Sequence, residues 1–227
     1  MGTSEHEPAP GGAKLDAGAL CLDFANTAEW HASANPEERL RAYGDFVAWS
    51  RRAELLTDPQ AARLLREARR RPAAAAAALR QVLLVRELIY RIFGAIAGDR
   101  LPTRQDLEAL NDSLPDALGR LRLARVGGGF AWGWAEEPRD LDWMLAPIVR
   151  SAADLLTSMD LARVRQCADD RGCGWLFLDR SKNRTRRWCD MGDCGNRAKA
   201  RRHREKRTMD HRPQTTDHRP QTTDHGP

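Results

Sequence analysis

Four of the five cysteines in this sequence lie close together near its end. They form two pairs, with five residues inside the first, four inside the second and fifteen between them: Cys167, Cys173, Cys189 and Cys194. Two close pairs joined by a chain long enough to fold back are typical of tetrahedral structural zinc sites. Thiolates suit Zn²⁺, and four of them close its coordination shell, which favours a structural role over catalysis. The alternative is a set of free buried cysteines.

Positive charge gathers around the same cysteines. Residues 163–207 contain 15 Lys and Arg against 6 Asp and Glu, whereas residues 1–162 contain 20 against 23. The whole chain has a formal charge of +5, so the positive excess lies in this one segment. The asymmetry predicts a neutral or acidic body that carries a compact cationic module. Because that module is too small for a core of its own, we expect loss of a cysteine ligand to unfold it and leave the body intact.

Two clusters of basic residues flank the second cysteine pair. One follows a short apolar strand predicted at 175–178, and the other lies on a helix predicted to begin near Gly195-Asn196, with no apolar side chain larger than alanine. Guanidinium groups match the geometry of phosphates. We therefore expect Trp175 to pack beneath a set of nucleic-acid contacts: Arg184, Arg186, Arg187, Arg197, Lys199, Arg201 and Arg202. The alternative is a solvated face that binds nothing.

At these residues the sequence resembles a known family. Residues 167–207, CADDRGCGWLFLDRSKNRTRRWCDMGDCGNRAKARRHREKR, are similar to the CGNR zinc finger, named for the tetrapeptide at 194–197. The body resembles the ABATE domain that commonly precedes this finger, through LCLDFANT at 20–27, YGDFVAW at 43–49, LVRELIYRIFGAIA at 84–97 and LEALN at 107–111. The resemblance implies a bacterial stress-induced transcription regulator with zinc on the four cysteines.

The body that must position these groups is predicted to be mainly helical. Proline near a cap residue signals helix starts at Asn35-Pro36, Asp58-Pro59 and Pro72. Apolar residues from 79 to 96 cover more than half the circumference of one helix, which we expect at the centre of the core and ending at Gly98. A further cap at Thr103 opens a helix to about residue 117, and residues 20–30 and 140–157 also favour helices.

Residues 121–135 have the pattern of a hairpin, with Phe130, Trp132 and Trp134 alternating onto one packed face. The predicted fold is therefore mainly α with a small antiparallel β-hairpin, followed by a small zinc-binding module of short β-structure and a basic helix. The expected organisation is a disordered lead-in at 1–14, an ABATE-like helical domain at 15–160, a CGNR-type finger at 163–207 and a disordered repeat tail at 208–227.

Polar residues inside the body invite a functional interpretation. Asp23, Asn26 and Thr27 stand between apolar residues, where they would line a pocket or, as we favour, satisfy nearby backbone groups. Arg86 on the central helix needs a carboxylate partner if it is buried. We treat Cys21 as a core residue and His31 as isolated. The sequence contains no catalytic constellation, and we expect no enzymatic activity.

These features together favour a cytoplasmic transcription regulator that binds DNA through its zinc module. We expect the N-terminal domain to sense a signal through a small-molecule ligand or to assemble into a homo-oligomer. An RNA- or ribosome-binding protein is the main alternative, since arginine-rich helices also suit RNA, and a protein-interaction module is another. No apolar run approaches the roughly 18 residues of a membrane span, and the first twenty residues lack the pattern of an export signal.

Overall fold

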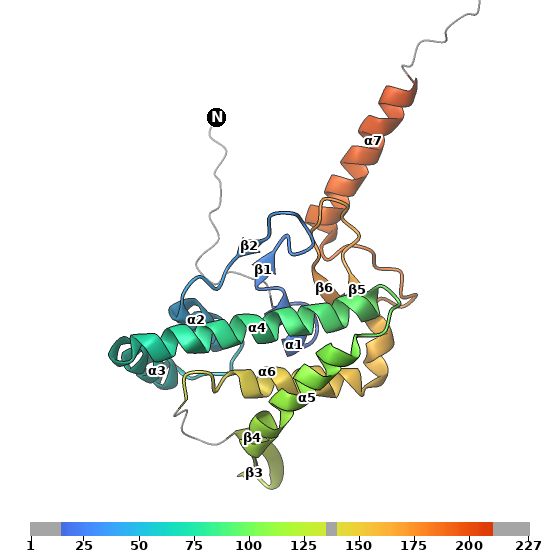
Figure 1. The fold of residues 1–227 in the computed structure, drawn as a ribbon. Helices are drawn as coiled ribbons and strands as arrows, with labels where there is room; N and C mark the ends of the chain where they lie inside the picture. Colours follow the sequence, from blue (N-terminus) through green and yellow to red (C-terminus); the bar gives the residue numbers. More distant parts are fainter. Residues whose placement is uncertain (1–14, 135–139, 211–227) are drawn as a thin grey trace, which may run out of the picture.

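The computed structural model describes residues 15–134 and 140–210 of the chain (Figure 1). Helices dominate this part: α1 (Leu20–Ala25), α2 (Tyr43–Arg52), α3 (Asp58–Arg70), α4 (Pro72–Ala97), α5 (Arg104–Gly119), α6 (Leu145–Leu156) and α7 (Asn196–Asp210). Short strands pair into antiparallel sheets: β1 (Ala28–Glu29) with β2 (Glu37–Glu38), β3 (Leu121–Val126) with β4 (Gly129–Trp134), and β5 (Val164–Gln166) with β6 (Leu176–Leu178). The predicted fold class, mainly α with a small hairpin, is confirmed. The lead-in at 1–14 and most of the repeat tail lie outside the described residues, whereas 208–210 are helical.

Helix α4 runs through the centre of the body (Figure 1). Its first residue is Pro72, whose missing N–H would have no partner at a helix start. Val82, Ile89, Ile92 and Phe93 point inward and are fully buried. The helix contacts α1, α2, α3, α5 and α6, and also β5 and β6. The prediction of a central helix that ends at Gly98 is confirmed.

Side-chain caps fix the starts of two neighbouring helices. At α3 the Thr57 hydroxyl accepts the Gln60 N–H at 3.4 Å, and the Gln60 side chain accepts the Thr57 N–H at 2.9 Å. At α5 the Thr103 hydroxyl accepts the Asp106 N–H at 3.1 Å. Asp106 also accepts a 2.9 Å bond from Arg91, which joins the start of α5 to α4. Both predicted helix starts are confirmed.

The helix predicted to begin at Asn35-Pro36 is wrong. Residues 35–42 are not helical, and the two glutamates after the proline form β2. Both carboxylate oxygens of Glu38 accept 2.6 Å bonds from Arg86 on α4, which is only 5% exposed. Since a buried guanidinium is costly without its partner, this long-range ion pair outweighs the local helix signal. The next helix, α2, begins at Tyr43.

The hairpin of β3 and β4 forms where it was predicted, but its aromatic face is not packed. Register places Leu123 opposite Trp132 and Arg125 opposite Phe130. Phe130 is 75% exposed and Trp132 is 62% exposed, and only Trp134 at the base packs against the core. The guanidinium of Arg150 lies over the Trp132 ring at 5.5 Å. The expectation of a buried aromatic face is therefore wrong for the outer part of the hairpin.

The last sheet, β5 with β6, packs against the body. Val164, Leu176 and Leu178 belong to the same buried cluster as α1 and α4. The side chain of Asn26 pairs with both backbone groups of Leu176, accepting its N–H at 2.9 Å and donating to its carbonyl at 2.8 Å. The Leu178 N–H donates to the carbonyl of Ala17 at 2.8 Å. The segment with the cysteines thus shares its core with the body.

Candidate metal centre and nucleic-acid interface

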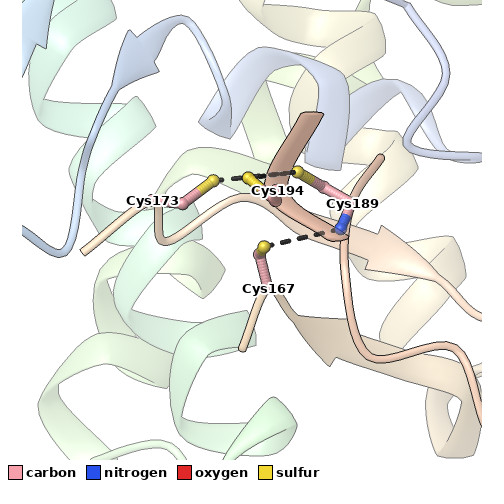
Figure 2. Close-up of side chains that lie close together, drawn as sticks. All are labelled: Cys167, Cys173, Cys189 and Cys194. Atoms are coloured by element: carbon pink, nitrogen blue, oxygen red, sulfur yellow. Dashed lines mark hydrogen bonds between the residues drawn. The ribbon is translucent and has the colours of Figure 1, made fainter. Parts of the chain in front are cut away.

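The four clustered cysteines come from four separate places in the C-terminal segment. Cys167 follows β5, and Cys173 lies in the loop before β6. Cys189 follows the arginine-rich residues 180–187, here called the basic loop, and Cys194 lies in the π-helical turn Met191–Gly195 that leads into α7. Their sulfur atoms all lie within 4.8 Å of one another (Figure 2). The Cys173–Cys189 and Cys189–Cys194 sulfur distances are 3.7 Å and 3.6 Å. These are close to the edge of about 3.8 Å that a tetrahedron with 2.3 Å Zn–S bonds requires. The cluster is a metal-binding site.

Backbone hydrogen bonds hold the loops that carry these cysteines. The Cys167 N–H donates to the Trp175 carbonyl at 2.8 Å, and the Cys189 N–H donates to the Cys167 sulfur at 3.5 Å. Gly174 has a φ of +70°, and a Cβ added there would lie 2.5 Å from the Tyr90 hydroxyl. Only glycine lets the loop turn in this way against the central helix. The Tyr90 hydroxyl in turn donates to the Gly174 carbonyl at 3.1 Å.

Four thiolates as close together as these sulfur atoms would repel one another unless a cation lay between them. Hydrogen bonds from Cys173 and Cys189 hold the pKa of Cys167 well below its usual range. Hydrogen bonds to Cys167 and Cys173 raise the pKa of Cys189, and burial together with the charges of Cys173 and Cys167 raises that of Cys194 to about 12. On its own the cluster therefore favours one thiolate among protonated neighbours. A divalent cation bound by the four sulfur atoms would displace those protons, so its affinity would weaken as pH falls.

Arg197 at the start of α7 turns toward the metal site. Its Nη2 donates to the Cys194 sulfur at 3.0 Å, and it forms ion pairs with Asp193 and, at 3.6 Å, with buried Asp169. Its guanidinium also lies over the ring of Trp30 at 5.0 Å. This arginine balances the negative charge of the thiolates and fixes the first turn of the helix.

Two more of the predicted contact residues are also engaged within the protein. Arg201 forms an ion pair with Asp170 at 2.5 Å and lies 3.9 Å from Asp169. Arg186 donates to the carbonyls of Trp188, at 3.0 Å, and of Cys189, and covers the ring of Phe177 at 4.4 Å. Both side chains are only partly exposed. They therefore position the basic loop and α7 against the metal site.

The other four predicted contact residues point outward. The exposed members are Arg184, Arg187, Lys199 and Arg202. Arg187 lies over the Trp188 ring at 5.2 Å. Trp175 is half-buried and shares a pocket with Arg197 beside the cysteines, so it lies beside the inward group. Sequence spacing identified the basic clusters, and the structure divides them into an inward and an outward set.

Comparison with protein families decides the lineage. Residues 18–159 match the ABATE model, described as "Putative stress-induced transcription regulator". The chain belongs to the ABATE family. Residues 163–207 of this ABATE chain match the CGNR zinc finger. No curated protein sequence matches the chain. Within the described ranges, no helix of the ABATE chain combines the length and apolarity needed to span a bilayer.

Asp23 and Thr27 in the ABATE body satisfy local backbone groups, as we favoured, whereas Asn26 bonds to the distant backbone of Leu176. The Asp23 carboxylate accepts the Ala17 N–H at 2.9 Å, and the Thr27 hydroxyl donates to the Phe24 carbonyl at 2.8 Å. Burial raises the pKa of Asp23 to about 6. Cys21 is fully buried, and burial raises the pKa of its thiol to about 12. These residues stabilise the fold around α1 and have no part in the metal site.

Sequence reasoning missed the contacts of two neighbouring residues, Trp30 with the finger and His31 with α4 of the ABATE body. Trp30 has a φ of +54°, and its ring lies near the guanidinium groups of both Arg197, at 5.0 Å, and Arg171, at 5.2 Å. His31 is not isolated, because it stacks on Tyr90 at 3.6 Å and its Nε2 lies 2.9 Å from a Glu87 carboxylate oxygen. No local pattern marks either residue, since their partners lie far away in the sequence. Their contacts fix the loop that faces the metal site.

Proposed function

We propose that this ABATE chain is a transcription regulator that holds Zn²⁺ on its four cysteines and binds DNA with α7. The proposal rests on the placement of α7, which begins at the metal site and projects away from the body (Figure 1). A helix without an apolar face has no core to cover. Lys199 and Arg202 are exposed on it, and a phosphate backbone is the partner that such side chains suit. In this proposal the chain has no catalytic activity.

The inward and outward basic residues have different roles in the proposal. Bound Zn²⁺ supplies a structural cross-link between the two cysteine pairs. Arg186, Arg197 and Arg201 position the loop and the helix through their carbonyl and carboxylate partners. The outward set, Arg184, Arg187, Lys199 and Arg202, contacts phosphates. The ABATE body senses a signal or mediates assembly.

The test compares two triple variants of equal charge. The first neutralises Arg187, Lys199 and Arg202 as glutamines, and the control neutralises the exposed Arg66, Arg69 and Arg70 on α3. Binding to labelled duplex DNA is measured by fluorescence anisotropy over a salt series. The slope of log K against log salt is negative, and each lost phosphate contact reduces its magnitude by about 0.9. We expect a slope reduced by about 2 to 3 for the first variant and an unchanged slope for the control.

Competition separates DNA from RNA as the partner. Structured RNA and duplex DNA compete for the wild-type protein, and duplex DNA with its readable major groove is expected to win. Tighter binding of RNA would replace the DNA assignment with the RNA-binding alternative. Equal losses in both triple variants would show a general charge effect and refute the assignment to α7. No binding to either polymer at low salt would refute the nucleic-acid function.

A further inference from the structure

The outer part of the β3–β4 hairpin carries an exposed apolar patch. Paired residues share a face of a sheet, so the register places the patch side chains together: Leu121, Leu123, Arg125, Phe130, Trp132 and Trp134. Leu123 is 64% exposed, Phe130 75% and Trp132 62%. A two-stranded hairpin is marginally stable in water unless one face is covered. The base has cover through Trp134, whereas the outer half has its apolar side chains in water.

The exposed area is large enough for a weak interface. Aromatic side chains bury about 150–250 Å² each, so the exposed fractions leave roughly 250 Å² on Phe130 and Trp132. Leu123 and the stem of Arg125 extend the patch to about 400–500 Å². Two such patches face to face bury about 800–1,000 Å² in total, the lower limit for specific association. An interface of this area lies at the weak, transient end of specific association.

We propose that the patch binds the same patch of a second copy, so that the chain forms a homodimer through stacked hairpins. The patch contains its own complementary chemistry, because Arg125 lies among aromatic rings. Within one chain the Trp132 ring already takes the guanidinium of Arg150 at 5.5 Å. A two-fold arrangement places Arg125 of each copy over an aromatic ring of the other and pairs apolar side chains around the axis. The patch contains no carboxylate, so no buried acid opposes the pairing.

This dimer has a consequence for the placement of the basic helices. The hairpin and α7 lie at opposite ends of the described structure (Figure 1). A dimer through the hairpins therefore holds its two α7 helices far apart, at the two ends of the assembly. Such an arrangement suits two separated polyanion segments better than adjacent half-sites one helical turn apart. The dimer itself does not depend on the proposed nucleic-acid binding.

The test measures the mass of the full chain, with zinc, by sedimentation equilibrium over a concentration series. The double variant Phe130→Lys and Trp132→Glu keeps the net charge and places both charges on the patch. The matched control, Leu101→Lys with Met159→Glu, makes the same charge changes at residues that are 91% and 97% exposed elsewhere. We expect a concentration-dependent dimer for the wild type and the control, and a dissociation constant raised at least about thirtyfold by the patch variant.

Each outcome decides the proposal. A wild-type chain that stays monomeric well above micromolar concentrations overturns it, as does a patch variant that dimerises as well as the wild type. Equal weakening by the control overturns it too, because the effect would then come from charge alone. Circular dichroism and zinc content show that the patch variant is folded, since both altered side chains are mostly exposed. Binding of the folded patch variant to a short DNA duplex is retained even when it is monomeric, which separates this test from that of the proposed function.

Discussion

Replacement of Asn26 by alanine tests whether the body and the finger form one cooperative unit. Asn26 is 1% exposed and makes two hydrogen bonds with the backbone of fully buried Leu176, at 2.8 Å and 2.9 Å. Alanine leaves a buried N–H and a buried carbonyl without these partners. Each unsatisfied group costs about 1–3 kcal/mol, so we expect the two groups to lower the free energy of unfolding by about 2–6 kcal/mol. Leu176 lies three residues after Cys173, so the metal site should loosen in the same transition.

The assay is urea unfolding at a fixed concentration of free zinc, followed by far-ultraviolet circular dichroism and by zinc release to a coloured chelator. Both signals are expected to shift together to lower urea, because Leu176 and α4 belong to one core. Asn111→Ala on the exposed face of α5 is the control and should change stability by at most about 0.5 kcal/mol. A loss below about 1 kcal/mol for Asn26→Ala would refute the reasoning. So would a shift of the zinc signal alone.

Two further predictions concern a titratable group and a ligand. Burial raises the pKa of Asp23 from 3.8 to about 6, so the folded protein disfavours the charged carboxylate. The free energy of unfolding therefore falls as pH rises from about 4 to about 6, and the loss is constant at higher pH. In Asp23→Asn the amide oxygen still accepts the Ala17 N–H, and no charge is buried. In thermal unfolding this variant should therefore gain stability relative to the wild type as pH rises through that range. Asp112→Asn, at an exposed position, should show no such trend. Elemental analysis should show that Cys189→Ser has lost most of its zinc, and this variant should also lose DNA binding. Cys21→Ala, the control, should keep one zinc per chain. Full zinc in Cys189→Ser would contradict a four-sulfur site.

Local signals in the sequence predicted the helices well where caps and periodicity agree. Thr103, Pro72 and the apolar stripe of α4 are such cases, because each acts within a few residues. The failure at residues 35–38 has a long-range cause, since Glu38 pairs with Arg86, 48 residues away. The hairpin shows a different limit. Alternation correctly predicted two strands, but it contains no information on whether another element covers the aromatic face.

The sequence also predicted the candidate site only as far as local patterns allow. The spacing of the cysteines was enough to predict that the four side chains lie together, because two close pairs can fold back on one metal. Helical spacing on α7 does not say which basic residues face the protein, since that depends on where the loop with Asp169 and Asp170 lies. Trp30 and His31 were missed for the same reason, as their partners come from the finger and from α4.

Charge balance explains why the basic residues divide as they do. Four thiolates on a divalent cation leave a net charge of −2, and Asp169 adds a buried carboxylate beside them. Arg197 and Arg201 lie against these groups, so their positive charge is neutralised within the protein and adds little to the field outside. The side chains of Lys199 and Arg202 are instead exposed to solvent. Reversal of the charge of Arg197 should therefore disturb the metal site first. Replacement of Lys199 should weaken phosphate binding alone.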